Sequence, residues 1–301
     1  MTSKKVEGAV ARYMCRQRSM ITLDQALKCG MTDGEIRGRR DSGLWATVAG
    51  GLYRSSEAPV TWEQRALGAC LIAGPGAVLS RRSAAVVWRF SGFRPGPIEI
   101  TVPLGRSSRN SIARVRRTGG LAKADLTRRD GIPVTRPLCT LLDLAGDVPL
   151  HVLEEAVDDA VIRRLVPLEQ LRARSLIEHG RGIRSLRRVL NAWPPGRLPG
   201  SLGEMRLTRW LLAHGAPLGE RQFIIRDADG RFVAQVDRAW PWAMAALEVD
   251  SMRWHGTPRG LNRDERRYPK IRALGWTLFT PEPGDDLMPL LAILQRAEHA
   301  A

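Results

Sequence analysis

Acidic residues gather in one stretch of this 301-residue chain where the sequence pattern predicts two paired strands. Val233–Ala239 alternates apolar and polar side chains, and Met244–Val249 is almost uniformly apolar, so both segments predict strands. An antiparallel pairing about a turn centred on residues 242–243 places Asp237 directly opposite Glu248, with their Cβ atoms roughly 5 Å apart. Like charges in that position destabilise a sheet unless protonation or a cation compensates them.

The chemistry that these side chains suggest is the binding of a divalent cation. Asp250 lies two residues after Glu248 and therefore shares its face of the strand. Asp237, Glu248 and Asp250 are the candidate ligands, and Mg²⁺ or Mn²⁺ is the expected ion, because hard cations prefer carboxylate oxygens. Such an ion can activate a water molecule and neutralise the charge that develops on a phosphate. His255 follows five residues later and is a candidate general base or acid, since imidazole titrates near neutral pH.

Three further residues complete the candidate site. Glu204 is a candidate catalytic carboxylate, but the spacing Ser201-x-x-Glu204 is also that of a capping box, so both roles stay open. Arg263 and Arg266 are predicted to contact DNA and to orient a phosphate. The nearby tryptophans either pack in a core or stack on bases; they are Trp240, Trp242, Trp254 and Trp276.

From residue 201 onward, the expected order of elements is helix, three strands, helix, strand and a last helix. This order and the acidic residues above resemble the PD-(D/E)XK restriction-endonuclease-like fold, and more narrowly the very-short-patch-repair-like nuclease domains. The segments VDRAWP, LEVDSMRWH, NRDERR and ALGWTLF carry the resemblance. It implies metal-dependent hydrolysis of DNA phosphodiester bonds. The chain departs from the family pattern at Val236, where proline is usual, and at Asp250, which occupies the position of the usual lysine.

The formal net charge of +16 is placed unevenly along the chain. Residues 1–200 carry 33 basic and 18 acidic side chains, whereas residues 201–301 carry 14 and 13. A basic front part suggests a polyanionic partner, with DNA the leading candidate. Only five of the 47 basic residues are lysine, so a genomic bias toward arginine is the alternative explanation.

Residues 1–58 predict a winged helix-turn-helix. Helical periodicity over residues 6–18 precedes two helices that Thr22 and Thr32 can cap, and Leu44–Arg54 predicts a hairpin. The stretch from ITLDQ to GGLYR resembles the N-terminal winged helix of AbiEi-type antitoxins, which implies DNA and a toxin encoded nearby as partners. The alternative is a small helical domain whose arginines only face water. The third helix, Asp33–Arg40, would enter the major groove and carries the candidate DNA-binding residues Arg37, Arg39 and Arg40.

Residues 59–195 predict a middle α/β domain, and its segment GIPVTRPLCTLLDLA is similar to the middle portion of the same antitoxin-like family. Its acidic residues, Asp143, Glu154, Glu155, Asp158 and Asp159, predict a solvated, ion-paired face. WPPGRLPG (residues 193–200) is the best candidate linker. Scattered cysteines and the lack of a signal peptide or an apolar span of about 18 residues favour a cytoplasmic protein that does not enter membranes.

The sequence therefore predicts a multidomain α/β (α+β) chain: a winged helix at 1–58, an antitoxin-like domain at 59–195 and an αβββαβ endonuclease-like domain at 201–301. The leading hypothesis is a DNA-binding protein with a Mg²⁺-dependent endonuclease domain. The main alternative is a non-enzymatic transcriptional regulator or antitoxin that keeps a degenerate nuclease fold as a binding scaffold. A third is an antitoxin paired with a nucleotidyltransferase-like toxin.

Overall fold

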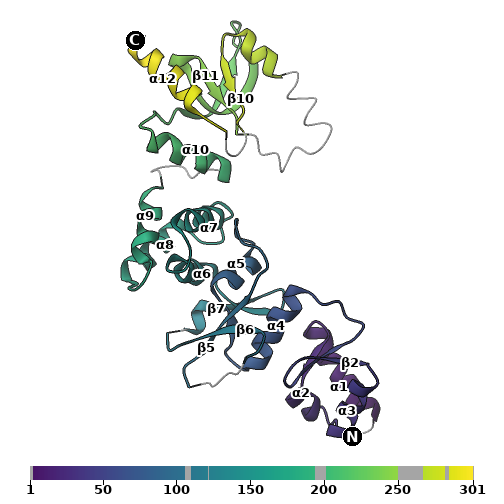
Figure 1. The fold of residues 1–301 in the computed structure, drawn as a ribbon. Coiled ribbons are helices and arrows are strands. Elements are labelled where there is room, and N and C mark those ends of the chain that lie inside the picture. Colours follow the sequence, from purple (N-terminus) through teal and green to yellow (C-terminus); the bar gives the residue numbers. More distant parts are fainter. Residues whose placement is uncertain are drawn as a thin grey trace. The chain divides into compact units, whose positions relative to one another are not determined.

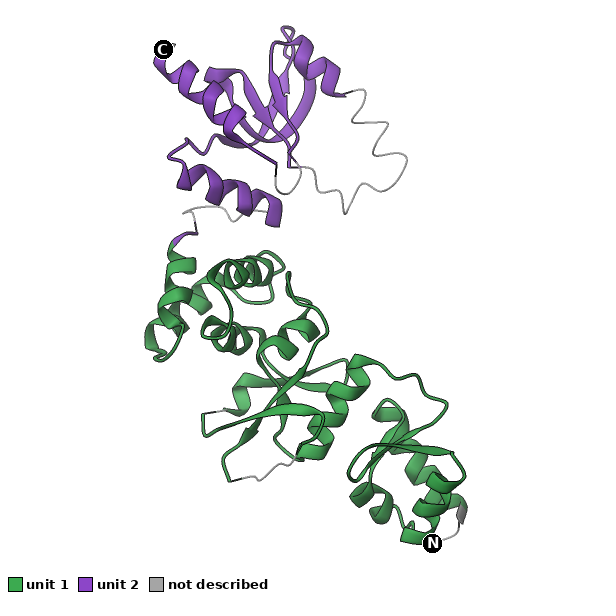
Figure 2. Cartoon of the chain, in the orientation of Figure 1, with its two compact units in different colours: residues 1–191 green, residues 192–301 purple. Residues whose placement is uncertain are grey.

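The computed structural model of the chain describes residues 3–105, 110–120, 122–193, 201–249, 267–281 and 285–300. Within these residues the fold is mixed α/β and contains three sheets, which confirms the predicted fold class (Figure 1). The chain divides into two compact units, residues 1–191 and 192–301 (Figure 2). The finer division of the first unit into two domains stays a prediction. None of the described helices combines the length and the apolar character that crossing a membrane requires.

The N-terminal part of the first unit has the predicted order of helices and hairpin. Thr22 and Thr32 each accept a hydrogen bond from the third residue of the following helix and complete a capping box, which explains where these helices begin. The sequence pattern missed one short buried strand, β1, which completes a sheet of order β1-β3-β2. The elements are α1 (Ser3–Arg16), β1 (Met20–Thr22), α2 (Leu23–Lys28), α3 (Asp33–Asp41), β2 (Trp45–Ala49) and β3 (Leu52–Ser55).

The remainder of the first unit is a five-stranded sheet with helices, in the order β6-β5-β4-β8-β7. The predicted helices and the two alternating strands form, whereas the two-residue β4 and the polar β7 were not predicted. Helices α4 and α5 both pack against β5. The elements are α4 (Trp62–Ala73), β4 (Val78–Leu79), α5 (Arg81–Trp88), β5 (Ile98–Pro103), β6 (Ala113–Thr118), η1 (Lys123–Asp125), β7 (Leu126–Arg129), β8 (Ile132–Thr135), α6 (Pro137–Ala145), α7 (Leu150–Ile162), α8 (Leu168–Ile177) and α9 (Ile183–Asn191).

The prediction that the acidic residues of this unit form a solvated face is wrong for α7. Asp158 and Asp159 are buried, at 3% and 6% exposure. Asp159 is ion-paired with Arg163 at 2.6 Å, so the pairing was expected correctly but its solvation was not. The physical reason is that the two aspartates lie between Val157 and Ala160 on a helix that packs against α6 and α9, and Arg163 compensates Asp159 for the lost hydration.

The second unit is a four-stranded sheet of order β12-β11-β10-β9 with helices. Strands β9, β10 and β11 are antiparallel, and β12 pairs parallel with β11. Residues 267–273 are helical and precede β12, as the sequence predicted. The other elements are α10 (Leu202–Ala213), β9 (Glu220–Arg226), β10 (Phe232–Trp240), η2 (Pro241–Ala243), β11 (Ala245–Leu247), β12 (Thr277–Phe279) and α12 (Met288–Ala300).

Two apolar clusters hold this sheet in place. One joins Trp240 and Leu247 to residues of α10 and α12, and the other joins Ala239 to Ile271 and Trp276. Trp240 and Trp276 are buried, in agreement with a core role, whereas Trp242 is 48% exposed. Trp254 lies outside the described residues.

Candidate functional site

The register of the β10–β11 hairpin brings the two predicted carboxylates together. Arg238 pairs with Leu247, and Trp240 pairs with Ala245. One further step along the same antiparallel register places Asp237 opposite Glu248, as the pattern predicted. Successive side chains of a strand alternate between faces, so these two carboxylates lie on the same side of the hairpin.

Asp237 accepts two hydrogen bonds, both from neutral donors. Its Oδ1 accepts a hydrogen bond from Gln222 Nε2 at 2.9 Å, and its Oδ2 accepts one from the Val249 backbone N–H at 2.9 Å. Burial raises the pKa of Asp237 above its ordinary value, and the negative charge of Glu204 adds to this increase. The two hydrogen bonds and the positive charge of Arg267 oppose the increase. The net effect is a raised pKa, so the fold disfavours the ionised form of Asp237.

Glu204 belongs to the same group of charges and also lies in the first turn of α10. The Ser201 hydroxyl accepts a hydrogen bond from the Glu204 N–H at 3.1 Å, so the predicted backbone cap is present. The Glu204 side chain is buried and forms an ion pair with Arg221, with Oε2 and Nη2 2.8 Å apart. Its carboxylate therefore turns toward β9 and close enough to Asp237 to influence its pKa.

Arginines compensate the remaining negative charge. Arg267, at the start of the described helical segment, forms an ion pair with Glu248. Arg238 is 3% exposed and donates to the Leu218 carbonyl at 2.8 Å and to Thr208 Oγ1 at 2.7 Å. The sequence reasoning missed Arg221, Gln222, Arg238 and Arg267. Only Arg238 could have been noticed from the sequence, because it is a charged residue close to the apolar end of a predicted strand.

The donor atoms of this cluster are those that a hard cation prefers, but the described part of the cluster is incomplete as a metal site. Among the residues that the structure describes, no three His, Cys, Asp or Glu side chains are grouped so that they could hold a metal ion. Asp237 and Glu248 supply two carboxylates. The other predicted site residues, Asp250, His255, Arg263 and Arg266, lie outside the described ranges.

The candidate DNA-binding arginines of α3 differ in how they are held. Arg39 forms an ion pair with Glu7 of α1, and its guanidinium lies 5.0 Å from the centre of the Trp45 ring. Arg40 lies 5.8 Å from the Tyr53 ring centre. Arg37 is exposed and forms no ion pair within the described part of the chain. Arg37 and Arg40 are therefore both presented to solvent, and the guanidinium groups of Arg39 and Arg40 also lie near aromatic rings of the hairpin.

Comparisons with known proteins show relatives of part of the chain. No family model matches it. Two curated Mycobacterium tuberculosis proteins, Uncharacterized protein Rv2248 (strain ATCC 25618 / H37Rv) and Uncharacterized protein MT2308 (strain CDC 1551 / Oshkosh), are each 33% identical over 164 residues, which is 52% of this chain and 56% of each relative. The chain thus spans about half the length of the curated relatives it matches. The crystal structure of the Rv2827c protein from Mycobacterium tuberculosis matches with a TM-score of 0.43 and 16% identity, covering 74% of this chain and 88% of that one.

Proposed function

We propose that this protein binds DNA and that its second unit hydrolyses DNA phosphodiester bonds with a divalent metal ion. The observation that supports this most is the juxtaposition of Asp237 and Glu248 across the β10–β11 hairpin, with Glu204 beside them. Like charges that lie close together in partly buried positions are costly unless they serve a site or are compensated. The order of elements around them, α10, β9, β10, β11, a helix and β12, is the order that the resemblance to restriction-endonuclease-like domains implies.

In this proposal each residue has a distinct task. Asp237 and Glu248 hold Mg²⁺ or Mn²⁺, with Asp250 as the third ligand. The ion, when bound, supplies an activated water and neutralises charge on the phosphate. His255 accepts or donates a proton at the reacting oxygen. The Arg267 guanidinium holds the Glu248 carboxylate in place through an ion pair, and Arg221 does the same for Glu204.

The first unit supplies the docking on DNA in the proposed function. Helix α3 with its exposed Arg37, followed by the β2–β3 hairpin, is the arrangement of a winged helix that places its last helix in the major groove. The resemblance to AbiEi-type antitoxins adds a toxin encoded nearby as a second proposed partner. In this proposal Arg37, Arg39 and Arg40 contact base edges or phosphates, and the guanidinium groups of Arg39 and Arg40 also lie near Trp45 and Tyr53 of the hairpin.

A cleavage assay tests the enzymatic part. The full chain is incubated with plasmid, mismatched duplex and single-stranded DNA in the presence of Mg²⁺ or Mn²⁺, beside the variants Asp237→Ala and Asp229→Ala. Asp229 is a matched control because it lies in an exposed turn, paired with Arg231. We expect the wild type and Asp229→Ala to cleave DNA, and Asp237→Ala not to cleave it. Absence of cleavage on every substrate, or equal cleavage by Asp237→Ala, contradicts the proposal.

The second candidate function is a non-enzymatic transcriptional regulator or antitoxin with the nuclease fold as a scaffold. The observation that favours it is that Glu204 and Glu248 are already ion-paired with arginines, which is the arrangement of a structural polar cluster. Asp250 at the usual position of lysine points the same way. Calorimetric titration with Mg²⁺ and Mn²⁺ separates the two functions. A binding site that disappears in Asp237→Ala supports the nuclease, and no metal-binding heat supports the regulator.

A further inference from the structure

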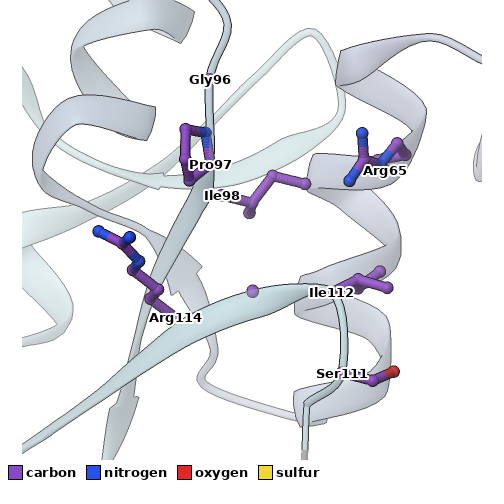
Figure 3. Close-up of a pocket in the computed structure, with 8 residues that line it drawn as sticks. Arg65, Gly96, Pro97, Ile98, Ser111, Ile112 and Arg114 are labelled. Atoms are coloured by element: carbon purple, nitrogen blue, oxygen red, sulfur yellow. The ribbon is translucent and has the colours of Figure 1, made fainter.

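A second surface of the first unit has the features of a binding site. A hollow of about 550 Å³ opens between α4, the segment that leads into β5 and the start of β6 (Figure 3). Its volume lies within the range of sites that hold a small molecule or one unit of a polymer. The residues that line it are Arg65, Gly96, Pro97, Ile98, Ser111, Ile112, Ala113 and Arg114.

Two arginines give the hollow its charge. Arg65 comes from α4 and Arg114 from β6, and their side chains border the hollow from two sides (Figure 3). Both are exposed, and neither forms an ion pair within the residues that the structure describes. The lining includes no carboxylate. The nearest register partner with a negative charge is Glu99, opposite Arg114 on β5, and its carboxylate accepts a hydrogen bond from the Arg82 N–H.

The strand that carries Arg114 extends the positive charge beyond the hollow. β6 lies at the edge of its sheet and pairs only with β5 in the described part of the chain. Arg116 follows on the same face of the strand, about 6.6 Å further along, and Arg117 adds a third positive charge to the strand. A line of closely spaced positive charges at an open edge matches a polyanion with regularly repeated charges better than a single small anion.

The floor of the hollow is apolar. Pro97, Ile98 and Ile112 line it, with Ile98 only 2% exposed. An apolar floor between two guanidinium groups suits a ligand that combines a phosphate with a sugar or base. Trp62 stiffens one wall, because its Nε1 donates to the Gly96 carbonyl at 2.8 Å.

We propose that this hollow, together with the edge strand β6, binds the sugar–phosphate backbone of a nucleic acid, with one phosphate between Arg65 and Arg114. The site is separate from α3 and from the carboxylates of the second unit. It rests on the DNA binding proposed above but not on DNA cleavage, so an assay without metal tests it apart from the nuclease activity.

The test measures oligonucleotide binding by the full chain in EDTA, over a range of salt concentrations, with random-sequence duplex DNA, single-stranded DNA and RNA as probes. Each phosphate contact contributes about 0.7–0.9 to the slope of log K against log salt. Replacing Arg65 and Arg114 by glutamine should lower the slope by about one and the affinity at 0.1 M salt about tenfold, with the curves meeting near 1 M. The matched control is Arg184→Gln with Arg188→Gln, which removes two exposed positive charges from α9.

The outcomes are distinguishable. An equal loss in the Arg65/Arg114 double variant and in the control overturns the inference, because only total charge then counts. Wild-type protein that binds none of the three probes also overturns it. Circular dichroism verifies that the variants fold. Photo-cross-linking of the wild-type complex provides a test without substitution: adducts are expected on residues 97–98 or 111–114, and adducts only elsewhere contradict the proposal.

Discussion

We expect Asp143 to make the stability of the first unit depend on pH. It lies in α6, and burial raises its pKa from 3.8 to about 6. The neighbouring carboxylate of Asp147 adds to the increase, and the positive charge of Arg81 opposes it. The folded state therefore keeps the proton of Asp143 between about pH 4 and pH 6, while the unfolded state releases it. Stability falls as the pH rises through this window, by about 3 kcal/mol for a difference of about two pKa units.

The variant Asp143→Asn removes this ionisation and should recover the lost stability. For a unit of this size, about 3 kcal/mol corresponds to an increase of about 6–12 °C in the melting temperature near pH 7.5. Near pH 4, at the lower end of this window, little of the stability has yet been lost, so the two proteins should melt much closer together. Scanning calorimetry between about pH 4 and pH 8 measures both differences.

Asp147→Asn is the matched control for this prediction. Its carboxylate is 2.5 Å from Arg81 Nη1, so removing its charge leaves a partly buried arginine without that ion-pair partner. We expect this variant to melt below the wild type near pH 7.5, in the opposite direction to Asp143→Asn. A melting-temperature increase for Asp143→Asn that is the same at pH 4 and at pH 7.5 refutes the reasoning, because the cause would then be packing instead of ionisation.

Other predictions concern all parts of the chain. A Cβ at Gly38 of α3 would meet open space and φ is not positive there, so Gly38→Ala should stabilise the fold by about 1 kcal/mol in denaturant titration. Arg238→Ala should destabilise the second unit by about 2–4 kcal/mol, measured the same way, because Thr208 and the Leu218 carbonyl lose a buried donor. Near neutral pH, a thiol reagent should react rapidly with Cys15 alone, and Cys15→Ser should abolish the fast phase. Burial raises the pKa of the other thiols, to about 12 for Cys70 and Cys139.

Local signals in the sequence were sufficient wherever the short-range chemistry determines the structure. The caps at Thr22 and Thr32 and the alternation of β5 depend on side chains within a few residues, and these elements form where they were predicted. The register that places Asp237 opposite Glu248 follows from the position of one tight turn. Such features need no knowledge of distant partners.

The parts that could not be predicted depend on contacts between distant segments. The three-residue β1 and the two-residue β4 are too short to show a period, and they become strands only because β3, β5 and β8 pair with them. The same holds for the ion pair between Glu248 and Arg267, which are 19 residues apart. Burial of Asp158 and Asp159 likewise depends on how α7 packs, which a helical pattern of charges does not reveal.

The two candidate functions differ in what balances the negative charge of Asp237. Glu204 and Glu248 each have an arginine partner, so their negative charges are compensated within the fold. The hydrogen bonds that Asp237 accepts from described residues come only from neutral donors, Gln222 and the Val249 N–H, and its pKa is raised. A bound cation would favour its ionised form and relieve the repulsion from Glu204. In a structural cluster without a cation, Asp237→Asn would remove the repulsion from Glu204 but leave one of the two donors without its acceptor oxygen. A change in stability alone therefore does not separate the two functions, whereas the loss of a metal-binding site in Asp237→Asn does.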